Sequence, residues 1–443
     1  MTLLVPDIKV TNVISTRQRQ QAMREIENGL IPRPTYDALL DSYLDTAPIK
    51  VLSGVRRCGK SSLLRMLANR LRAKGIPESN ILYKKLDSFD VPLEPTSAWL
   101  DDLLRRALAD REQGSPLYVF LDEVQEVAGW EKAVRRLHTE QAADIYLTGS
   151  NAFLLSSDLV TYLSGRYIEV PVWPLSFPEY LEFSRVADPR SSELSRDELF
   201  ARFVRFGGMP GLFDKTSFKE EFVMKELTAI RDTVILNDVA KRFDLRNIDL
   251  LEKLVRYVYS TSGNLFSARK IADTLTSMGR KTNPTTVDTY LSALRRAFLV
   301  LQCEQEGIAG KTVLQPLQKL YAPDTGLRNR EIGFTSRDIG YQLENIVFCE
   351  LKRRGYDIHV GAGASGEVDF VADRSSGRLY VQVSSNVVEG DTLERELRSL
   401  EAVRDSFPKI ILTRDSLHWG TTGTGIEIVS LVDWLCAEEP KGR

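Results

Sequence analysis

Residues 54–62 carry the side chains and the backbone freedom needed to hold a polyphosphate. The run reads Gly54, Val55, Arg56, Arg57, Cys58, Gly59, Lys60, Ser61 and Ser62. Its glycines allow successive backbone N–H groups to point at phosphate oxygens, Lys60 supplies a mobile positive charge, and the Ser61 hydroxyl can ligate Mg²⁺. An apolar run at 49–52 precedes the loop and another begins at 63, as in a strand followed by a helix. The pattern predicts ATP as a ligand of residues 54–62.

Two neighbouring acidic residues end a second apolar run, about 60 residues after the loop. The run covers 117–121 and reads as a central parallel strand that is covered on both faces. Asp122 at its tip can hold Mg²⁺ together with Ser61, and Glu123 can polarise an attacking water. We therefore predict a hydrolytic site in which Glu123 is the general base.

The elements that must position these residues alternate between strand and helix. Apolar or β-branched runs predict strands at 49–53, 81–86, 117–121, 144–148 and 167–171, with helices between them. This series predicts an α/β fold with a mostly parallel sheet.

Ser150 and Asn151 follow the fourth strand, where a small polar side chain can reach the γ-phosphate or the attacking water. Arg166 precedes the fifth strand, where AAA+-type ATPases often carry an arginine finger that stabilises charge on the γ-phosphate.

Helical patterns predict a lid at 173–245, after an ATPase core at 1–172. Helices at 177–184, 193–205 and 217–236 would form this lid. The turn Gly207-Gly208-Met209-Pro210 between two of them is either a hinge or a static corner. Residues 1–45 look helical and polar, and either form a solvated lead-in or pack beside the nucleotide base.

Residues 246–335 predict a winged-helix-like domain. They hold 13 Lys and Arg against 8 Asp and Glu, so the segment is basic. Residues 267–275 read as a helix, and Asn283 with Pro284 opens a second one. Val287, Tyr290, Leu291 and Leu294 share one face of that helix, which leaves Thr285, Thr286, Thr289 and Arg295 outward. Runs at 298–302 and 312–314 suggest a hairpin. Two readings stay open: duplex DNA binding, or a fold used for packing.

Residues 336–443 predict a further α/β domain. A helix at 340–354 carries Glu344, strands at 366–372 and 379–384 follow, and a helix at 391–405 and a strand at 409–413 complete the pattern. Glu344, Asp369, Gln382 and Ser384 resemble the metal site of PD-(D/E)xK nucleases, which needs two acids and a lysine. Neutral Gln382 and Ser384 leave one acid and the lysine missing. We therefore expect a degenerate site without nuclease activity.

Taken together, the motifs resemble those of a group of prokaryotic P-loop ATPases near the AAA+ and STAND proteins. The shared motifs are GxRRxGKS at 54–61, LDEVQ at 121–125, TGSN at 148–151, SGR at 164–166, PLSFxE at 174–179 and GGxP at 207–210. Members carry a C-terminal domain that resembles PD-(D/E)xK nucleases. The resemblance extends over the chain from about residue 20 and implies ATP binding and hydrolysis, without naming a process.

Bulk composition narrows the classes of protein. The 443 residues include 59 Lys and Arg against 61 Asp and Glu, so overall charge favours neither a nucleic-acid nor a membrane partner. The four scattered cysteines and three histidines lack metal-ligand spacing, which predicts a reduced, cytoplasmic, zinc-free protein.

We expect an ATP-driven switch that acts on DNA or a partner protein, with a homo-oligomer also open. The alternatives are an ATP-regulated nuclease and an ATP-binding scaffold with negligible turnover.

Overall fold

A computed structural model describes residues 29–114, 116–141, 143–149, 163, 165–213, 219–241, 243–245, 247–306, 317–363, 366–385, 390–414 and 419–437. The chain divides into two compact units. The first covers 1–52, 60–149 and 158–170, and the second covers 53–59, 150–157 and 171–443. Within the described ranges, no helix is long and apolar enough to span a lipid bilayer.

The first unit is built on a five-stranded sheet with the strand order β2-β3-β4-β1-β5. Its strands are β1 (Ile49–Ser53), β2 (Ile81–Lys85), β3 (Leu117–Asp122), β4 (Ala143–Thr148) and β5 (Tyr167–Pro171). Strands β1, β2, β3 and β4 pair in parallel. All residues of β1 and β3 are buried, as their apolar sequences require. The predicted parallel α/β sheet is confirmed, with each strand within one residue of its expected bounds.

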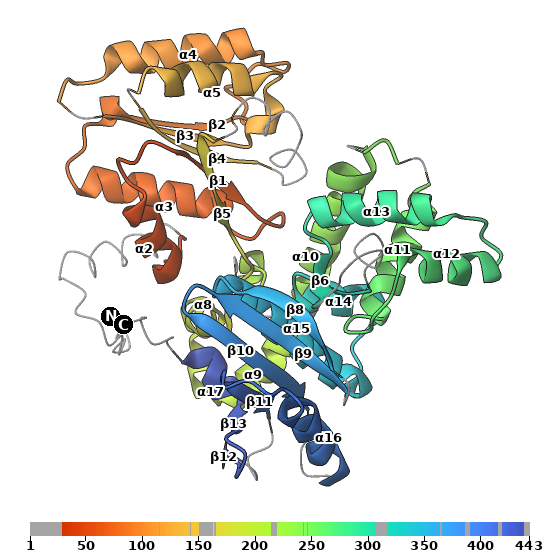
Figure 1. The fold of residues 1–443 in the computed structure, drawn as a ribbon. Coiled ribbons are helices and arrows are strands. Elements are labelled where there is room, and N and C mark those ends of the chain that lie inside the picture. The colour runs from red at the N-terminus through yellow and green to blue at the C-terminus, as the bar shows by residue number, and fades with distance from the viewer. Residues whose placement is uncertain are drawn as a thin grey trace. The chain divides into compact units, whose positions relative to one another are not determined.

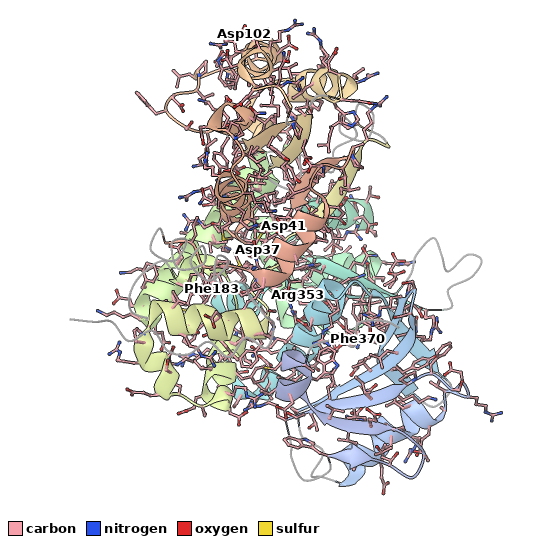
Figure 2. All side chains as sticks on the ribbon, turned by 90° about the vertical axis from the view of Figure 1, so that its left-hand side faces the viewer. Asp37, Asp41, Asp102, Phe183, Arg353 and Phe370 are labelled. Atoms are coloured by element: carbon pink, nitrogen blue, oxygen red, sulfur yellow. The ribbon has the colours of Figure 1, made fainter. Side chains whose placement is uncertain are left out.

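Helices cover both faces of this sheet (Figure 1). They are α2 (Pro34–Ser42), α3 (Lys60–Ala73), α4 (Ser97–Asp110) and α5 (Trp130–Thr139). Helix α2 is fastened to α3 by ion pairs from Arg70 to Asp37 and Asp41, both labelled in Figure 2. Burial raises the pKa of Asp37, and Arg70 partly offsets that effect. The described part of the lead-in therefore packs on the helix that follows the phosphate loop.

The second unit begins with helices α8 (Phe177–Ala187), α9 (Arg196–Phe206) and α10 (Glu220–Thr233), which continues as a π-helix at Val234–Lys241. The PLSFxE motif starts α8 through a capping box. Ser176 Oγ accepts the Glu179 N–H at 3.3 Å, and Glu179 Oε2 accepts the Ser176 N–H at 2.8 Å. These two bonds satisfy backbone donors that a helix start leaves open. The three helices predicted for the lid are confirmed, with ends shifted by a few residues.

Three further helices precede a strand pair. They are α11 (Ile248–Ser260), α12 (Ala268–Ser277) and α13 (Pro284–Arg296), followed by antiparallel β6 (Leu301–Gln305) and β7 (Gln318–Tyr321). Asn283 caps α13 by accepting the Thr286 N–H at 2.8 Å, as its sequence predicts. The second strand of the hairpin lies at 318–321, and the stretch expected at 312–314 falls outside the described residues.

The strand pair belongs to a larger sheet that runs to the end of the described chain. Its order is β12-β13-β11-β10-β9-β8-β6-β7. The remaining strands are β8 (Asp357–Gly363), β9 (Gly366–Arg374), β10 (Gly377–Ser384), β11 (Lys409–Thr413), β12 (Gly420–Thr421) and β13 (Glu427–Ser430). The helices are α14 (Thr325–Ile332), α15 (Ile339–Arg353), α16 (Gly390–Glu401) and α17 (Leu431–Cys436). The boundary expected at 335/336 thus falls between strands of one sheet.

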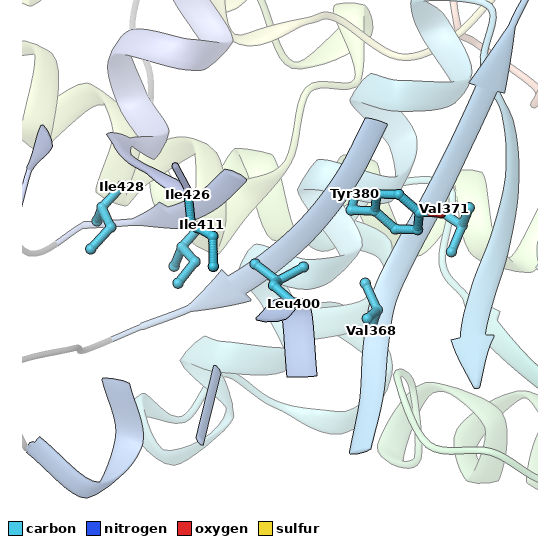
Figure 3. Close-up of a cluster of buried hydrophobic side chains, with 7 residues drawn as sticks. All are labelled: Val368, Val371, Tyr380, Leu400, Ile411, Ile426 and Ile428. Atoms are coloured by element: carbon cyan, nitrogen blue, oxygen red, sulfur yellow. The ribbon is translucent and has the colours of Figure 1, made fainter. Parts of the chain in front are cut away.

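Apolar side chains from this sheet and from α16 form a core cluster (Figure 3). Its members are Val368, Val371, Tyr380, Leu400, Ile411, Ile426 and Ile428. Strand β10 pairs with antiparallel β9 on one side and with parallel β11 on the other, so it is an inner strand of the sheet. The cluster fixes β9 and β10, the two strands that carry Asp369 and Gln382.

Candidate nucleotide site

The phosphate loop connects β1 to α3 and has the backbone that its glycines allow. Gly54 has φ +142°, and a Cβ there would lie 2.1 Å from Val172 O, so no larger residue fits. The Cys58 N–H donates to Val55 O at 3.2 Å, which closes a turn within the loop. The Cys58 side chain is buried and free of a disulfide. The loop therefore has a fixed shape set by its neighbours.

Ser61 and Asp122, the two residues predicted to hold Mg²⁺, meet at the end of the loop. Lys60 is the first residue of α3 and is 7% exposed. Ser61 follows it, and Ser61 Oγ donates to Asp122 Oδ1 at 2.9 Å. Asp122 ends β3, so the sheet brings the hydroxyl and the carboxylate together across 61 residues of sequence. This is the pairing that a Mg²⁺ ion bound beside phosphates requires.

The Asp122 carboxylate is buried and surrounded by hydroxyl groups. Thr148 Oγ1 donates to Oδ1, and the Tyr83 hydroxyl lies 3.3 Å from Oδ2. Burial raises the pKa of Asp122, the hydroxyl donors oppose this, and the charge of Glu123 adds to it. A nearby cation would stabilise this buried carboxylate, because its hydroxyl donors carry no charge. The residues present therefore fit a Mg²⁺ ion held by Ser61 and Asp122.

Glu123 is held in an uncommon backbone conformation. Its φ of 60° and ψ of 53° place it in the left-handed region, which few residues other than glycine adopt. Its N–H donates to Thr148 Oγ1 at 3.0 Å, and Gln125 Nε2 donates to its Oε2 at 2.5 Å. Such strained positions persist where the surroundings fix them, and they gather at functional sites. The Glu123 carboxylate, next to Asp122 in sequence, is thus fixed in backbone and side chain.

Thr148 and Tyr83 are site residues that the sequence analysis missed. Thr148 ends β4, and Tyr83 lies in β2, the two strands that flank β3. The rule that carboxyl ends of parallel strands share one edge would have found Thr148 beside Asp122. Ser150 and Asn151, which were predicted for this edge, lie outside the described residues.

Arg166 lies at the other end of the sheet from the phosphate loop. Its carbonyl oxygen accepts the Ile49 N–H at 2.8 Å, whereas Ser53 O accepts the Val172 N–H at 2.7 Å. Strand β5 therefore runs parallel to β1, and Arg166 is beside the start of β1. The loop follows the end of β1, roughly 16 Å further along a strand of this length. Arg166 has an exposed side chain, but it does not reach the phosphate loop of its own chain.

The four residues of the expected nuclease-like site come together only in part. Glu344 lies on α15, Asp369 on β9, and Gln382 and Ser384 on β10. The Asp369 N–H donates to Gln382 Oε1 at 3.1 Å. Ser384 is buried and pairs with Thr413 of β11. The motif position of the lysine is Ser384, as expected, but Lys319 of β7 reaches this cluster from outside the motif.

The cluster does not fit the metal that a nuclease would need. Lys319 Nζ lies 2.8 Å from Glu344 Oε1 and 3.5 Å from Asp369 Oδ1. Its ammonium therefore occupies the space between the two acids that would bind a divalent ion. In the described part of the chain, no group of three or more His, Cys, Asp or Glu side chains could hold a metal ion.

Two stretches of the chain match known protein families. Residues 46–181 match a family described as an AAA domain, and residues 197–338 match a domain of unknown function, DUF8612. Among solved structures, a Walker-type ATPase of Pyrococcus abyssi is 17% identical with a TM-score of 0.47, over 68% of this chain and 95% of that one. The Aeropyrum pernix ORC1 protein in complex with DNA is 15% identical with a TM-score of 0.30, over 68% and 91%.

Two relatives match over nearly the whole chain. An uncharacterized protein of Haemophilus influenzae is 36% identical over 93% of this chain and 100% of its own length. An uncharacterized protein of Methanocaldococcus jannaschii is 30% identical over 91% of this chain and 86% of its own length. These alignments include the AAA domain and the second unit alike. The chain therefore belongs, with these two proteins, to a family of P-loop proteins that carry an AAA domain.

Proposed function

We propose that this chain is an ATP-hydrolysing molecular switch that acts on duplex DNA or on a partner protein. The observation that carries the proposal is the 2.9 Å contact between Ser61 Oγ and Asp122 Oδ1, with Glu123 fixed beside it. This arrangement joins the phosphate loop to the strand end that holds the metal and the base.

Each residue of the site has one task in this proposal. Lys60 neutralises the β and γ phosphates, while Ser61 and Asp122 hold the Mg²⁺ ion of the bound nucleotide. When bound, Mg²⁺ would neutralise charge on the phosphate oxygens. Glu123 accepts a proton from the attacking water, and the N–H···O bond to Thr148 keeps its backbone in place. The Thr148 hydroxyl aligns Asp122 and Glu123 together.

Arg56 and Arg57 link the phosphate loop to the lid through ion pairs. Arg56 Nη1 lies 3.4 Å from Asp238 Oδ1 in the π-helix, and Arg57 forms an ion pair with Glu226 of α10. Guanidinium groups bind phosphate oxygens strongly, so a triphosphate in the loop competes with both carboxylates. π-helical segments are rare and are often found at functional sites. We propose that nucleotide binding weakens these two ion pairs and so changes the lid.

A finger role for Arg166 requires a second copy of the chain. Because Arg166 lies beside the start of β1, it could act only on the nucleotide of a neighbour. An arginine supplied in this way stabilises charge that develops on the transferred phosphoryl group. The proposal therefore includes a homo-oligomer in which Arg166 completes the adjacent site.

Helices α12 and α13 and the turn between them form the surface proposed for DNA. Arg269, Lys270, Lys281, Thr285 and Thr289 are exposed there, while the apolar face of α13 is buried. Arg295 does not belong to this surface, contrary to the sequence expectation. It is half-buried in the last turn, donates to Gln302 of β6, and burial lowers its pKa. The remaining basic groups suit backbone phosphates, which need no sequence-specific geometry.

Steady-state ATP turnover with and without duplex DNA tests the proposal. The switch predicts measurable Mg²⁺-dependent hydrolysis that rises when DNA is added at low salt, because bound DNA would favour one state of the lid. Hydrolysis that DNA leaves unchanged would move the target to a partner protein. ATP binding without any turnover would support the scaffold alternative instead.

A further inference from the structure

The buried Lys319 ammonium lies among three carboxylates of the second unit. Its Nζ is 2.8 Å from Glu344 Oε1, 2.5 Å from Glu367 Oε1 and 3.5 Å from Asp369 Oδ1. Lys319 comes from β7, Glu344 from α15, and the other two acids from β9. Only 2% of the lysine side chain is exposed. Three elements that are separate in sequence therefore converge on one buried positive charge.

The oxygens around this charge have further donors that fix their directions. The Tyr321 hydroxyl donates to Glu344 Oε1 at 2.7 Å, and the Val383 N–H donates to Asp369 Oδ2 at 2.9 Å. Gln382 uses its Oε1 to accept the Asp369 N–H and its Nε2 to donate to Glu396. The glutamine oxygen, which would otherwise be a third ligand, is therefore already used. The cluster is complete as a hydrogen-bonded network without an added ion.

We propose that Lys319 is a built-in replacement for the divalent cation of a nuclease-like site. The chain itself supplies the positive charge that holds α15, β7 and β9 together, and the cluster binds no catalytic metal. The Lys319 ammonium already contacts the Glu344 and Asp369 oxygens that would bind a Mg²⁺ ion, so a metal at this place would have to displace it. The lysine and the metal are thus mutually exclusive occupants. This inference is independent of the ATPase proposal, because it concerns a different unit.

The electrostatics of the cluster agree with a permanently charged lysine. Burial alone would lower the pKa of Lys319, but the charges of Glu344, Asp369 and Glu367 together raise it above its ordinary value. Burial and the neighbouring Glu344 raise the pKa of Asp369, and Lys319 opposes that rise. Removing the ammonium leaves buried carboxylates without their cation, which is a severe defect in a protein interior.

The test is Lys319→Met in the full chain, which shortens the side chain by one atom and removes its charge. We expect a lower melting temperature than the parent, and a rise in that temperature when Mn²⁺ is added without nucleotide. The variant should bind Mn²⁺ at least about tenfold more tightly than the parent, because the emptied space now attracts a cation. Lys352→Met on α15 is the matched control, since Lys352 pairs with Asp357 and not with the cluster. It should change neither quantity.

A charge-balanced second variant covers the case in which Lys319→Met does not fold. Lys319→Met with Glu344→Gln removes one positive and one negative charge, so it should melt higher than the single variant and respond less to Mn²⁺. Two results would overturn the proposal. One is Mn²⁺ binding by the parent that Asp369→Asn abolishes, because the cluster would then be a metal site despite Lys319. The other is the absence of any Mn²⁺ response in both Lys319 variants.

Discussion

The backbone N–H of Gly208 donates a hydrogen bond to Asp324 Oδ2 across 2.6 Å. Gly207 stands beside it with φ +76°, and a Cβ there would lie 2.1 Å from Asp324 Oδ1. The same carboxylate caps α14 by accepting the Leu327 N–H at 3.0 Å. The glycines of the GGxP turn therefore allow α9 to end against a buried acid. This contact favours the static corner over the hinge.

Asp324 gives the corner a defined dependence on pH. Burial raises its pKa from an ordinary value of 3.8 to about 6, although three backbone N–H groups oppose the rise. The folded protein thus binds this proton more tightly than the unfolded chain does. The stabilising contribution of Asp324 is largest at pH values below its unfolded pKa, and it is lost as pH rises through about 6.

We therefore expect the parent to gain stability relative to Asp324→Asn as pH falls from about 7 to about 4. The full span is up to about 3 kcal/mol for a shift of this size. Denaturant unfolding of both proteins across that pH range measures the difference. Asp338→Asn, which changes a half-buried acid in the same part of the chain, serves as the control. A parent-to-variant gap that widens in the opposite direction would mean that Asp324 is stabilised as an anion.

The ion pairs of the phosphate loop should weaken nucleotide binding. Glu226→Gln frees Arg57 from its partner, so the guanidinium becomes available to phosphate oxygens. We expect ATP affinity to rise by about 3-fold to 5-fold, because a partly exposed pair contributes only about 0–1 kcal/mol. Glu221→Gln on the same helix is the control, since Glu221 pairs with exposed Lys225. Equal ATP affinities of the parent and both variants would remove the loop from the proposed route to the lid.

Thr148→Val keeps the shape of the side chain and removes the hydroxyl that contacts Asp122 and Glu123. Turnover should fall by about 10-fold to 100-fold, the usual range for residues that orient ligands of a metal, while ATP binding persists. Thr139→Val provides the comparison, because the Thr139 hydroxyl bonds only to its own helix at Arg135 O. Turnover at the parental rate would show that Asp122 and Glu123 do not need this hydroxyl.

Arg166→Ala should bind ATP normally and hydrolyse it about 10³-fold more slowly if Arg166 is the finger. Because Arg166 lies far from the loop of its own chain, activity should partly return on mixing Arg166→Ala with Lys60→Ala. In the mixed assembly, one copy supplies the intact loop and the other the intact arginine. Full activity of Arg166→Ala alone would make Arg166 an ordinary surface residue.

The sheet of the first unit could be read from the sequence because parallel strands that are covered on both faces appear as short apolar runs. The start of α13 at Pro284 was equally readable, since Asn283 caps it locally. The contact of Lys319 with Asp369 could not be read, because it depends on how β7 and β9 approach across 50 residues. The half-buried position of Arg295 has a similar cause, because helical spacing does not say that its side chain bonds to Gln302 of β6.

The central claim is that Lys60 binds the nucleotide and that Glu123 activates the water that hydrolyses it. The most direct measurement is ATP binding and ATP turnover, determined side by side for the parent, Lys60→Ala and Glu123→Gln. We predict that Lys60→Ala loses binding, because the loop lacks its phosphate-neutralising charge. We predict that Glu123→Gln keeps binding and loses turnover, because no carboxylate accepts the proton of the water. Hydrolysis by Glu123→Gln at the parental rate would contradict the account.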